Sequence, residues 1–135
     1  MAKRALKADK GLAGGRMLSV RIKDRYLNQI SISMARRGMG KKGRSEWFRL
    51  ALVSLAKMAA DDKGGFLASL ELYESTGGKG IQITLDGDSL AAFERLHALA
   101  LKSPGSKAAL ITRLATMAAH LQLFDEGIAT TFGHG

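Results

Sequence analysis

The chain has 135 residues, of which 46% are hydrophobic and 24% are charged, so it can build one compact domain with its own core. It contains no cysteine, which excludes a disulfide framework, thiolate zinc sites and a cysteine nucleophile. No apolar run approaches the ~18 residues of a membrane span, and the basic N-terminus lacks the apolar segment of a signal peptide. We therefore expect a cytoplasmic protein.

The positive charge is concentrated in the first part of the chain. Lys and Arg number 21 against 12 Asp and Glu, for a formal net charge of +9. Residues 1–57 hold 15 basic and 3 acidic residues, whereas residues 58–135 hold 6 basic and 9 acidic ones. One strongly basic half suggests a polyanionic partner, but a merely soluble basic protein could show the same imbalance.

The first half predicts an arm, a strand and a helix. Residues 1–16 mix Lys and Arg with Ala and Gly and show no apolar period, which predicts a flexible basic arm. Leu18 to Lys23 then alternates apolar and polar residues, as a half-buried strand does. Asp24 is the predicted N-cap of a helix whose apolar residues recur at helical spacing up to Arg37.

A second helix and a connector follow. Residues 38–43 (GMGKKG) break the first helix, and the apolar pattern predicts a second one from Arg44 to about Ala60. Residues 61–79 contain two aspartates, several glycines and the short apolar piece FLASLELYES. We interpret this segment as a connector.

The second half repeats the pattern of the first. Residues 81–85 alternate apolar and polar positions, and Asp86 begins a predicted helix that runs to about Lys102. Ser103-Pro104-Gly105 ends that helix, and Ser106 caps a final one. Residues 124–135 are interpreted as a frayed tail.

The two halves match in pattern at an offset of 63 residues, which places Val20 on Ile83. A strand–helix–helix unit of about 45 residues is too small to bury the apolar face of its own strand. Two units, at residues 17–60 and 80–123, solve this problem together. We predict a mainly α fold of order β-α-α-β-α-α, in which the two strands pair antiparallel into a ribbon and four helices cover its inner face.

Four segments of the first unit carry a family resemblance: the strand LSVRIK, the helix start DRYLNQI, the glycine turn and the second-helix opening GRSEWFRLAL. They resemble the ribbon-helix-helix family of DNA-binding proteins, the superfamily of the Arc and methionine repressors. The second unit (IQITLD, SLAAFERL, SPGSKAALITRLA) fits the outline without the Arg-Ser-Glu letters. Most members dimerise through one unit per chain, so this chain is similar to the fused pseudo-dimers among conjugative relaxosome accessory proteins.

The resemblance implies that the ribbon enters the major groove of duplex DNA, where base edges carry a distinguishable donor and acceptor code. Strand side chains alternate, so inward apolar residues leave polar ones facing outward. Arg21 can pair bidentately with guanine and Gln82 with adenine. The predicted base-reading residues are Ser19, Arg21, Lys23, Gln82 and Thr84.

The resemblance also implies phosphate contacts at the start of each second helix, where free N–H groups and the helix dipole attract anions. The predicted contacts are Lys41, Lys42, Gly43, Arg44 and Ser45 in the first unit, and Ser106 and Lys107 in the second. The arm could follow the DNA backbone or enter a minor groove. Its basic residues are Lys3, Arg4, Lys7, Lys10 and Arg16.

We therefore expect sequence-specific binding of double-stranded DNA, as a transcriptional repressor or as an accessory factor in plasmid transfer or partition. One pseudo-dimer reads only a few base pairs, so further copies on adjacent sites would raise the affinity. No nucleophile, base and orienting acid can be placed in one site, and no spacing suggests a metal. We expect no enzyme activity, no catalytic residue, no metal, no cofactor and no membrane partner.

Two other interpretations stay open. In one, the chain is an antitoxin-like or assembly adaptor whose connector or tail binds a protein partner, such as a relaxase or a toxin, with DNA binding secondary. In the other, it is a sequence-neutral architectural protein that works through phosphate contacts alone.

Overall fold

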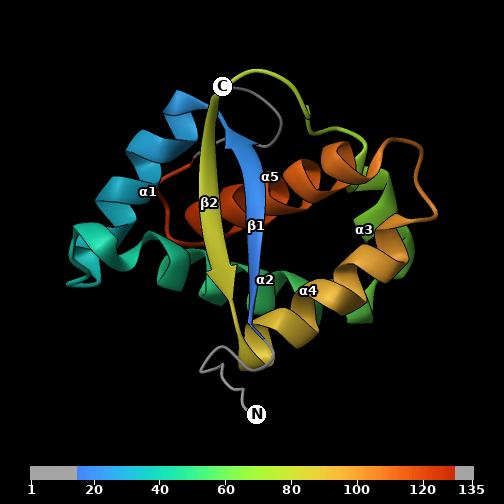
Figure 1. Ribbon diagram of the computed structural model, residues 1–135, viewed down its shortest axis with the longest axis horizontal. Helices are drawn as coiled ribbons and strands as arrows, with labels where there is room; N and C mark the ends of the chain where they lie inside the picture. The colour runs from blue at the N-terminus through green and yellow to red at the C-terminus, as the bar shows by residue number, and fades with distance from the viewer. Residues whose placement is uncertain (1–14, 130–135) are drawn as a thin grey trace, which may run out of the picture.

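The structure, a computed structural model, describes residues 15–129 and places one two-stranded antiparallel sheet in front of five helices (Figure 1). This confirms the predicted mainly α fold with a β-ribbon, with one helix more than expected. The elements in chain order are β1 (Arg16–Ile22), α1 (Asp24–Arg36), the 3₁₀ turn η1 (Lys41–Gly43), α2 (Arg44–Asp61), α3 (Lys63–Leu70), β2 (Lys79–Leu85), α4 (Gly87–Ala100) and α5 (Lys107–Asp125).

The pairing register of the two strands agrees with the 63-residue offset between the two halves of the sequence. β1 and β2 pair so that Ser19 lies opposite Gln82, and these two residues are 63 positions apart, the same offset that superposes the two halves. In an antiparallel pair of equivalent strands, a two-fold axis passes where a residue faces its own counterpart. The Ser19–Gln82 pair therefore marks a pseudo-two-fold axis through the ribbon.

The inward face of the ribbon joins the core. Alternate side chains of both strands are at most 9% exposed, as the period-two pattern predicts. They are Leu18, Val20, Ile22, Ile81, Ile83 and Leu85.

Helix α5 passes directly behind the ribbon and is buried on almost all sides (Figure 1). Its sequence is apolar or small around the whole circumference, which is typical of a helix surrounded by other elements. The largest fully buried side chains of the core come from the helices around it: Trp47, Phe48, Phe66 and Phe93. Within residues 15–129, no helix is both long enough and apolar enough to cross a bilayer.

The first helix begins differently from the prediction. Its N-cap is Lys23, and Asp24 is its first helical residue. The reason lies in the backbone: the Lys23 carbonyl already accepts from the amides of Tyr26 and Leu27, at 3.0 and 3.1 Å. Asp24 still favours the helix, because an acid in the first turn interacts well with the helix dipole.

The connector expected at residues 61–79 contains helix α3, which the sequence analysis missed. The Asp62 side chain accepts from the Gly65 amide at 2.9 Å and so caps this helix. Phe66 and Leu70 are fully buried against the core. The cap and this burial outweigh the poor helix propensity of the glycines in the first turn.

The fold also extends further at both ends than expected. Arg16, assigned to the arm, is the first residue of β1, and its guanidinium lies over the ring of Phe93, 5.3 Å from the centroid. The tail was expected to begin at Phe124, but α5 continues to Asp125 and Glu126 binds to α1.

Glu126 sits in a network of hydrogen bonds that joins α1, α2 and the end of α5. Its carboxylate accepts from Ser33 Oγ, from Arg37 Nη2 at 2.6 Å and from Gln122 Nε2 at 2.7 Å. Ser33 Oγ in turn accepts from the indole of Trp47 at 2.8 Å. The network therefore reaches from the surface to the largest side chain of the core.

This network predicts a pH-dependent contribution to stability. Burial raises the pKa of Glu126, but hydrogen bonds from Ser33, Gln122 and Arg37 together hold that pKa below its ordinary value of 4.5. A carboxyl whose pKa is lower in the folded than in the unfolded state stabilises the fold above its unfolded pKa. That contribution is lost as the pH falls through the folded pKa.

We expect the free energy of unfolding to fall less steeply below pH 4.5 in Glu126→Gln than in the wild type. Urea unfolding at several pH values measures this, with Asp125→Asn as the control at an exposed neighbouring acid. Equal pH slopes in the wild type and Glu126→Gln would contradict the prediction.

Candidate nucleic-acid interface

The outward face of the ribbon is turned away from the helices (Figure 1). Its side chains form three cross-strand pairs, and all of them are exposed except the half-buried Thr84. From one end of the ribbon to the other, the pairs are Arg21–Gly80, Ser19–Gln82 and Met17–Thr84. Four of the five predicted base-reading residues thus lie together on one surface.

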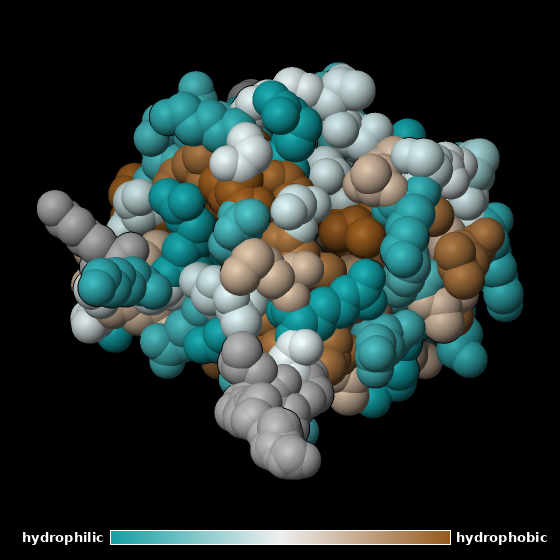
Figure 2. Space-filling model, in the orientation of Figure 1, coloured by the Kyte–Doolittle hydropathy of each residue, from teal (hydrophilic) through white to brown (hydrophobic). Residues whose placement is uncertain are grey.

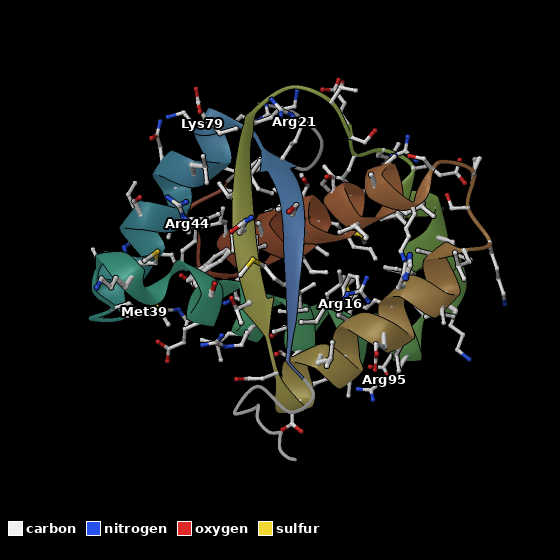
Figure 3. The ribbon with its side chains drawn as sticks, in the orientation of Figure 1. Arg16, Arg21, Met39, Arg44, Lys79 and Arg95 are labelled. Atoms are coloured by element: carbon white, nitrogen blue, oxygen red, sulfur yellow. The ribbon has the colours of Figure 1, made fainter. Side chains whose placement is uncertain are left out.

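Arg21 is held against the turn that leads into β2. Its Nε donates to the carbonyl of Gly77 at 3.1 Å, and its Nη2 donates to the carbonyl of Gly78 at 2.7 Å. The guanidinium has five N–H donors in a planar fork, and these two carbonyls engage only the edge formed by Nε and Nη2. Figure 3 shows Arg21 at the end of the ribbon, near Lys79.

Lys23, the fifth predicted reader, lies one residue beyond the end of the strand. The strand ends at Ile22, so the alternation that would turn Lys23 outward stops one residue earlier. The Lys23 ammonium forms an ion pair with Glu74 of the connector at 2.5 Å. Its hydrogen bond, and then its charge, hold the pKa of Glu74 below the ordinary value.

The second helices hold the two outer edges of the ribbon. On the β2 edge, the Thr84 amide donates to Ser45 Oγ at 3.0 Å, and Arg49 Nη1 donates to the Thr84 carbonyl at 2.8 Å. On the β1 edge, the Arg21 amide donates to Thr112 Oγ1 at 3.3 Å. Arg49 and Thr112 are again 63 positions apart, so the two edges are bound at equivalent places. Each edge therefore lies beside the start of one second helix.

A groove of about 830 Å³ runs along the β1 edge, between the ribbon and the start of α5. It brings Ser106, a predicted phosphate contact, next to the predicted readers Ser19, Arg21 and Gln82. Ser106 also caps α5, because its Oγ accepts from the Ala109 amide at 3.1 Å.

The other predicted phosphate contacts lie at the helix starts. Lys41, Lys42 and Gly43 form η1, and Arg44 and Ser45 begin α2 beside β2. Lys107 is the first residue of α5 and is exposed. Of the basic residues of the predicted arm, only Arg16 lies within the described residues; those outside are Lys3, Arg4, Lys7 and Lys10.

Positively charged side chains lie on two sides of the ribbon and at one of its ends. In Figure 3, Arg44 lies on one side of it, Arg16 on the other, and Arg21 and Lys79 at one end. Two cations also act on His97 of α4, whose ring stacks on Phe93. Burial lowers the pKa of His97, and the nearby charges of Lys107 and Arg16 lower it further. Figure 2 shows hydrophilic side chains over much of this face, with apolar surface between them. The face therefore combines cations with polar and apolar contact area.

Three residues at this surface or its edges were not predicted from the sequence. Met17 is 58% exposed and continues the outward series of β1, so one more step of the same alternation would have found it. Arg49 of α2 and Thr112 of α5 form hydrogen bonds with the backbone of the ribbon edges. The apolar periodicity of a helix predicts which of its faces is buried, but it does not predict which of its polar residues will bind a strand.

The edge contacts predict a measurable loss of stability. Ser45→Ala removes the acceptor of the partly buried Thr84 amide, which we expect to lower the free energy of unfolding by about 1 kcal/mol. Ser54→Ala, at an exposed serine of the same helix, is the control and should change it by less than about 0.5 kcal/mol. Urea unfolding of both variants measures the difference, and equal losses would show that the contact does not stabilise the ribbon edge.

The candidate site is thus an exposed polar strand face with a helix start beside each edge. Within residues 15–129, no three His, Asp or Glu side chains are placed to hold a metal ion. Comparisons with protein-family models, with curated proteins and with solved structures find no match to this chain.

Proposed function

We propose that the protein binds double-stranded DNA sequence-specifically by placing the outward face of β1 and β2 in the major groove. The observation that supports this most directly is the exposed ribbon face that carries Arg21, Ser19 and Gln82, with a helix start at each edge. The major groove admits a two-stranded ribbon and displays a different pattern of donors and acceptors for each base pair. In this proposal the chain is a ribbon-helix-helix protein with two units fused in one polypeptide.

The chemistry of each cross-strand pair suggests what it reads. Arg21 can donate two hydrogen bonds to guanine, and Gln82 can pair bidentately with adenine. Met17 and the methyl group of Thr84 offer apolar contact for the methyl group of thymine. Side chains two residues apart on one strand face are about 6.6 Å apart, so the three pairs span about 13 Å. That length corresponds to about four base-pair steps at about 3.4 Å each.

The helix starts are placed to meet the backbones on both sides of the groove. The start of α2 lies at the β2 edge and the start of α5 at the β1 edge. The major groove is about 12 Å wide, so a ribbon inside it has one phosphate backbone beside each of its edges. Lys42 and Arg44 would neutralise one backbone and Lys107 the other, while the helix N-termini offer N–H donors.

The pseudo-two-fold axis implies a non-palindromic DNA site. It exchanges Arg21 with Thr84, and Met17 with Gly80. These residues have different chemistry, so the two ends of the ribbon cannot read the same base pair. A palindromic operator requires equivalent halves in the protein.

A site of about five base pairs occurs too often in a genome to be a unique address. We therefore propose that several copies of the chain bind adjacent sites, as a repressor or as a plasmid transfer or partition factor would.

The first test is the selection of bound duplexes from a random library at about 150 mM salt, where phosphate contacts alone are weakened. We expect one short, asymmetric motif with a G·C pair at one end, because Arg21 lies at one end of the ribbon. Binding at low salt without enrichment would indicate an architectural protein. Absence of binding at both salt concentrations would contradict the proposal and favour a protein-binding adaptor.

Two substitutions distinguish base recognition from electrostatic attraction to the phosphates. Arg21→Ala should cost about 1–3 kcal/mol on the selected motif and relax the preference at one base pair. Lys42→Ala should weaken binding to all sequences alike and lower the slope of log affinity against log salt by about one. The control is Lys57→Ala, which removes an exposed charge about 18 Å further along α2 than Ser45. Titrations on matched and mismatched duplexes measure these effects, and equal losses on all duplexes for Arg21→Ala would refute its reading role.

A further inference from the structure

The guanidinium of Arg21 has a preset position before any DNA is bound. Two consecutive carbonyls, those of Gly77 and Gly78, accept from its Nε and Nη2 at 3.1 and 2.7 Å. Arginine otherwise samples many rotamers, and ordering it on binding costs conformational entropy. In this protein the two hydrogen bonds already order the Arg21 side chain, so less conformational entropy is lost when DNA binds.

The turn that supplies these carbonyls requires glycine. Gly77 and Gly78 have φ of 78° and 74°, in the left-handed region. A Cβ on Gly78 would lie 2.5 Å from the carbonyl carbon and oxygen of Ile22 and 2.8 Å from the amide nitrogen of Lys23. The turn therefore packs directly on the backbone at the end of β1, the strand that carries Arg21.

The segment that leads into the turn is also anchored. Arg113 of α5 donates from Nε to the carbonyl of Tyr73 at 3.1 Å, and from Nη1 to that of Pro104. One residue after Tyr73, Glu74 pairs with Lys23. The segment between α3 and β2 is thus tied to α5, to the end of β1 and to Arg21.

We propose that the Gly77–Gly78 turn is a specificity-determining element of the DNA-binding face, which positions Arg21 to read one G·C pair. This inference rests on the proposed DNA-binding function. The turn carbonyls occupy the Nε–Nη2 edge, which leaves the donors of Nη1 and the remaining Nη2 hydrogen for a base. Gly80, opposite Arg21, adds no side chain that could stand between the guanidinium and the DNA.

The same geometry gives the protein one orientation on DNA. In the sequence, a Gly-Gly pair also precedes β1, as Gly14-Gly15, 63 residues before Gly77-Gly78. The strand residue that corresponds to Arg21 at that end is Thr84, which has no guanidinium. Only one end of the ribbon therefore carries an arginine held for guanine, and the polarity of the motif follows from the position of this turn.

The decisive experiment uses the full chain with Gly78→Ala and measures affinity for the selected motif and for every single-base variant of it. We expect discrimination at the base pair read by Arg21 to fall about tenfold, since one mismatch is worth about that much. Discrimination at the other base pairs and affinity for random-sequence DNA should stay as in the wild type. A general loss of stability would not produce a change confined to one base pair.

Two controls separate the role of the turn from simple strain. Gly38→Ala places a side chain at a similar φ of 73°, with nothing within 4 Å of the new Cβ, and should not alter discrimination. In the background of Arg21→Ala, Gly78→Ala should cause no further loss of discrimination, because the turn acts through that arginine. Losses that add, or that are equal at every base pair, would overturn the proposal.

A milder substitution keeps the test open if Gly78→Ala does not fold. A Cβ on Gly77 meets only the flexible end of Lys23, with Nζ at 3.5 Å. Gly77→Ala should therefore fold and cause a smaller loss at the same base pair, and an unchanged preference there would overturn the proposal. If the wild type selects no motif at all, the proposed function itself fails, which is a distinct result.

Discussion

The structure depends on the burial of six apolar side chains on one face of two strands that are far apart in the sequence. A two-stranded ribbon alone is at best marginally stable in water, whereas each buried aliphatic side chain contributes about 1.5–3 kcal/mol. Strand side chains have a period of two, so burying Leu18, Val20 and Ile22 fixes Ser19 and Arg21 outward. A slip of one residue would expose the whole apolar set. The exposed polar face is therefore a consequence of the core.

Helices α2 and α5 extend this constraint to the ribbon edges. An edge strand leaves amides and carbonyls unpaired, and here Ser45, Arg49 and Thr112 bind some of them. Because these residues lie in the first two turns of α2 and α5, the contacts that satisfy the edges also bring the helix starts beside the outward face. The stability of the ribbon and the composition of the candidate interface thus have the same structural origin.

The sequence predicted those parts of the fold that follow from local pattern. Alternation located both strands, the repeated pattern predicted that they pair antiparallel, and Ser106 is the cap it was expected to be. Helix α3 escaped prediction because two glycines weaken its local signal, while its stability comes from the Asp62 cap and from tertiary burial. The outward position of most predicted readers also followed from alternation.

The remaining features of the site could not be read from the sequence. Arg21 binds carbonyls 56 and 57 residues away, and no residue type encodes a backbone acceptor. Strand alternation predicts that Lys23 faces outward as Arg21 does. Its side-chain position depends instead on where the strand ends and on its ion pair with Glu74 of the connector. Both cases are contacts between the end of the first strand and the segment that precedes the second, so they exist only in the folded chain.

Because both strands of the ribbon belong to one chain, its two ends can differ, which the ends of a ribbon made by two identical chains related by symmetry could not do. The connector lies at one end, beside Arg21 and Lys23, and supplies the glycine turn there. At the other end, the position equivalent to Lys23 is Asp86, and Asp88 follows in the first turn of α4. The two ends of the ribbon therefore carry different side chains. In the proposed complex, the held arginine favours one orientation of the ribbon on DNA through its contact with a base.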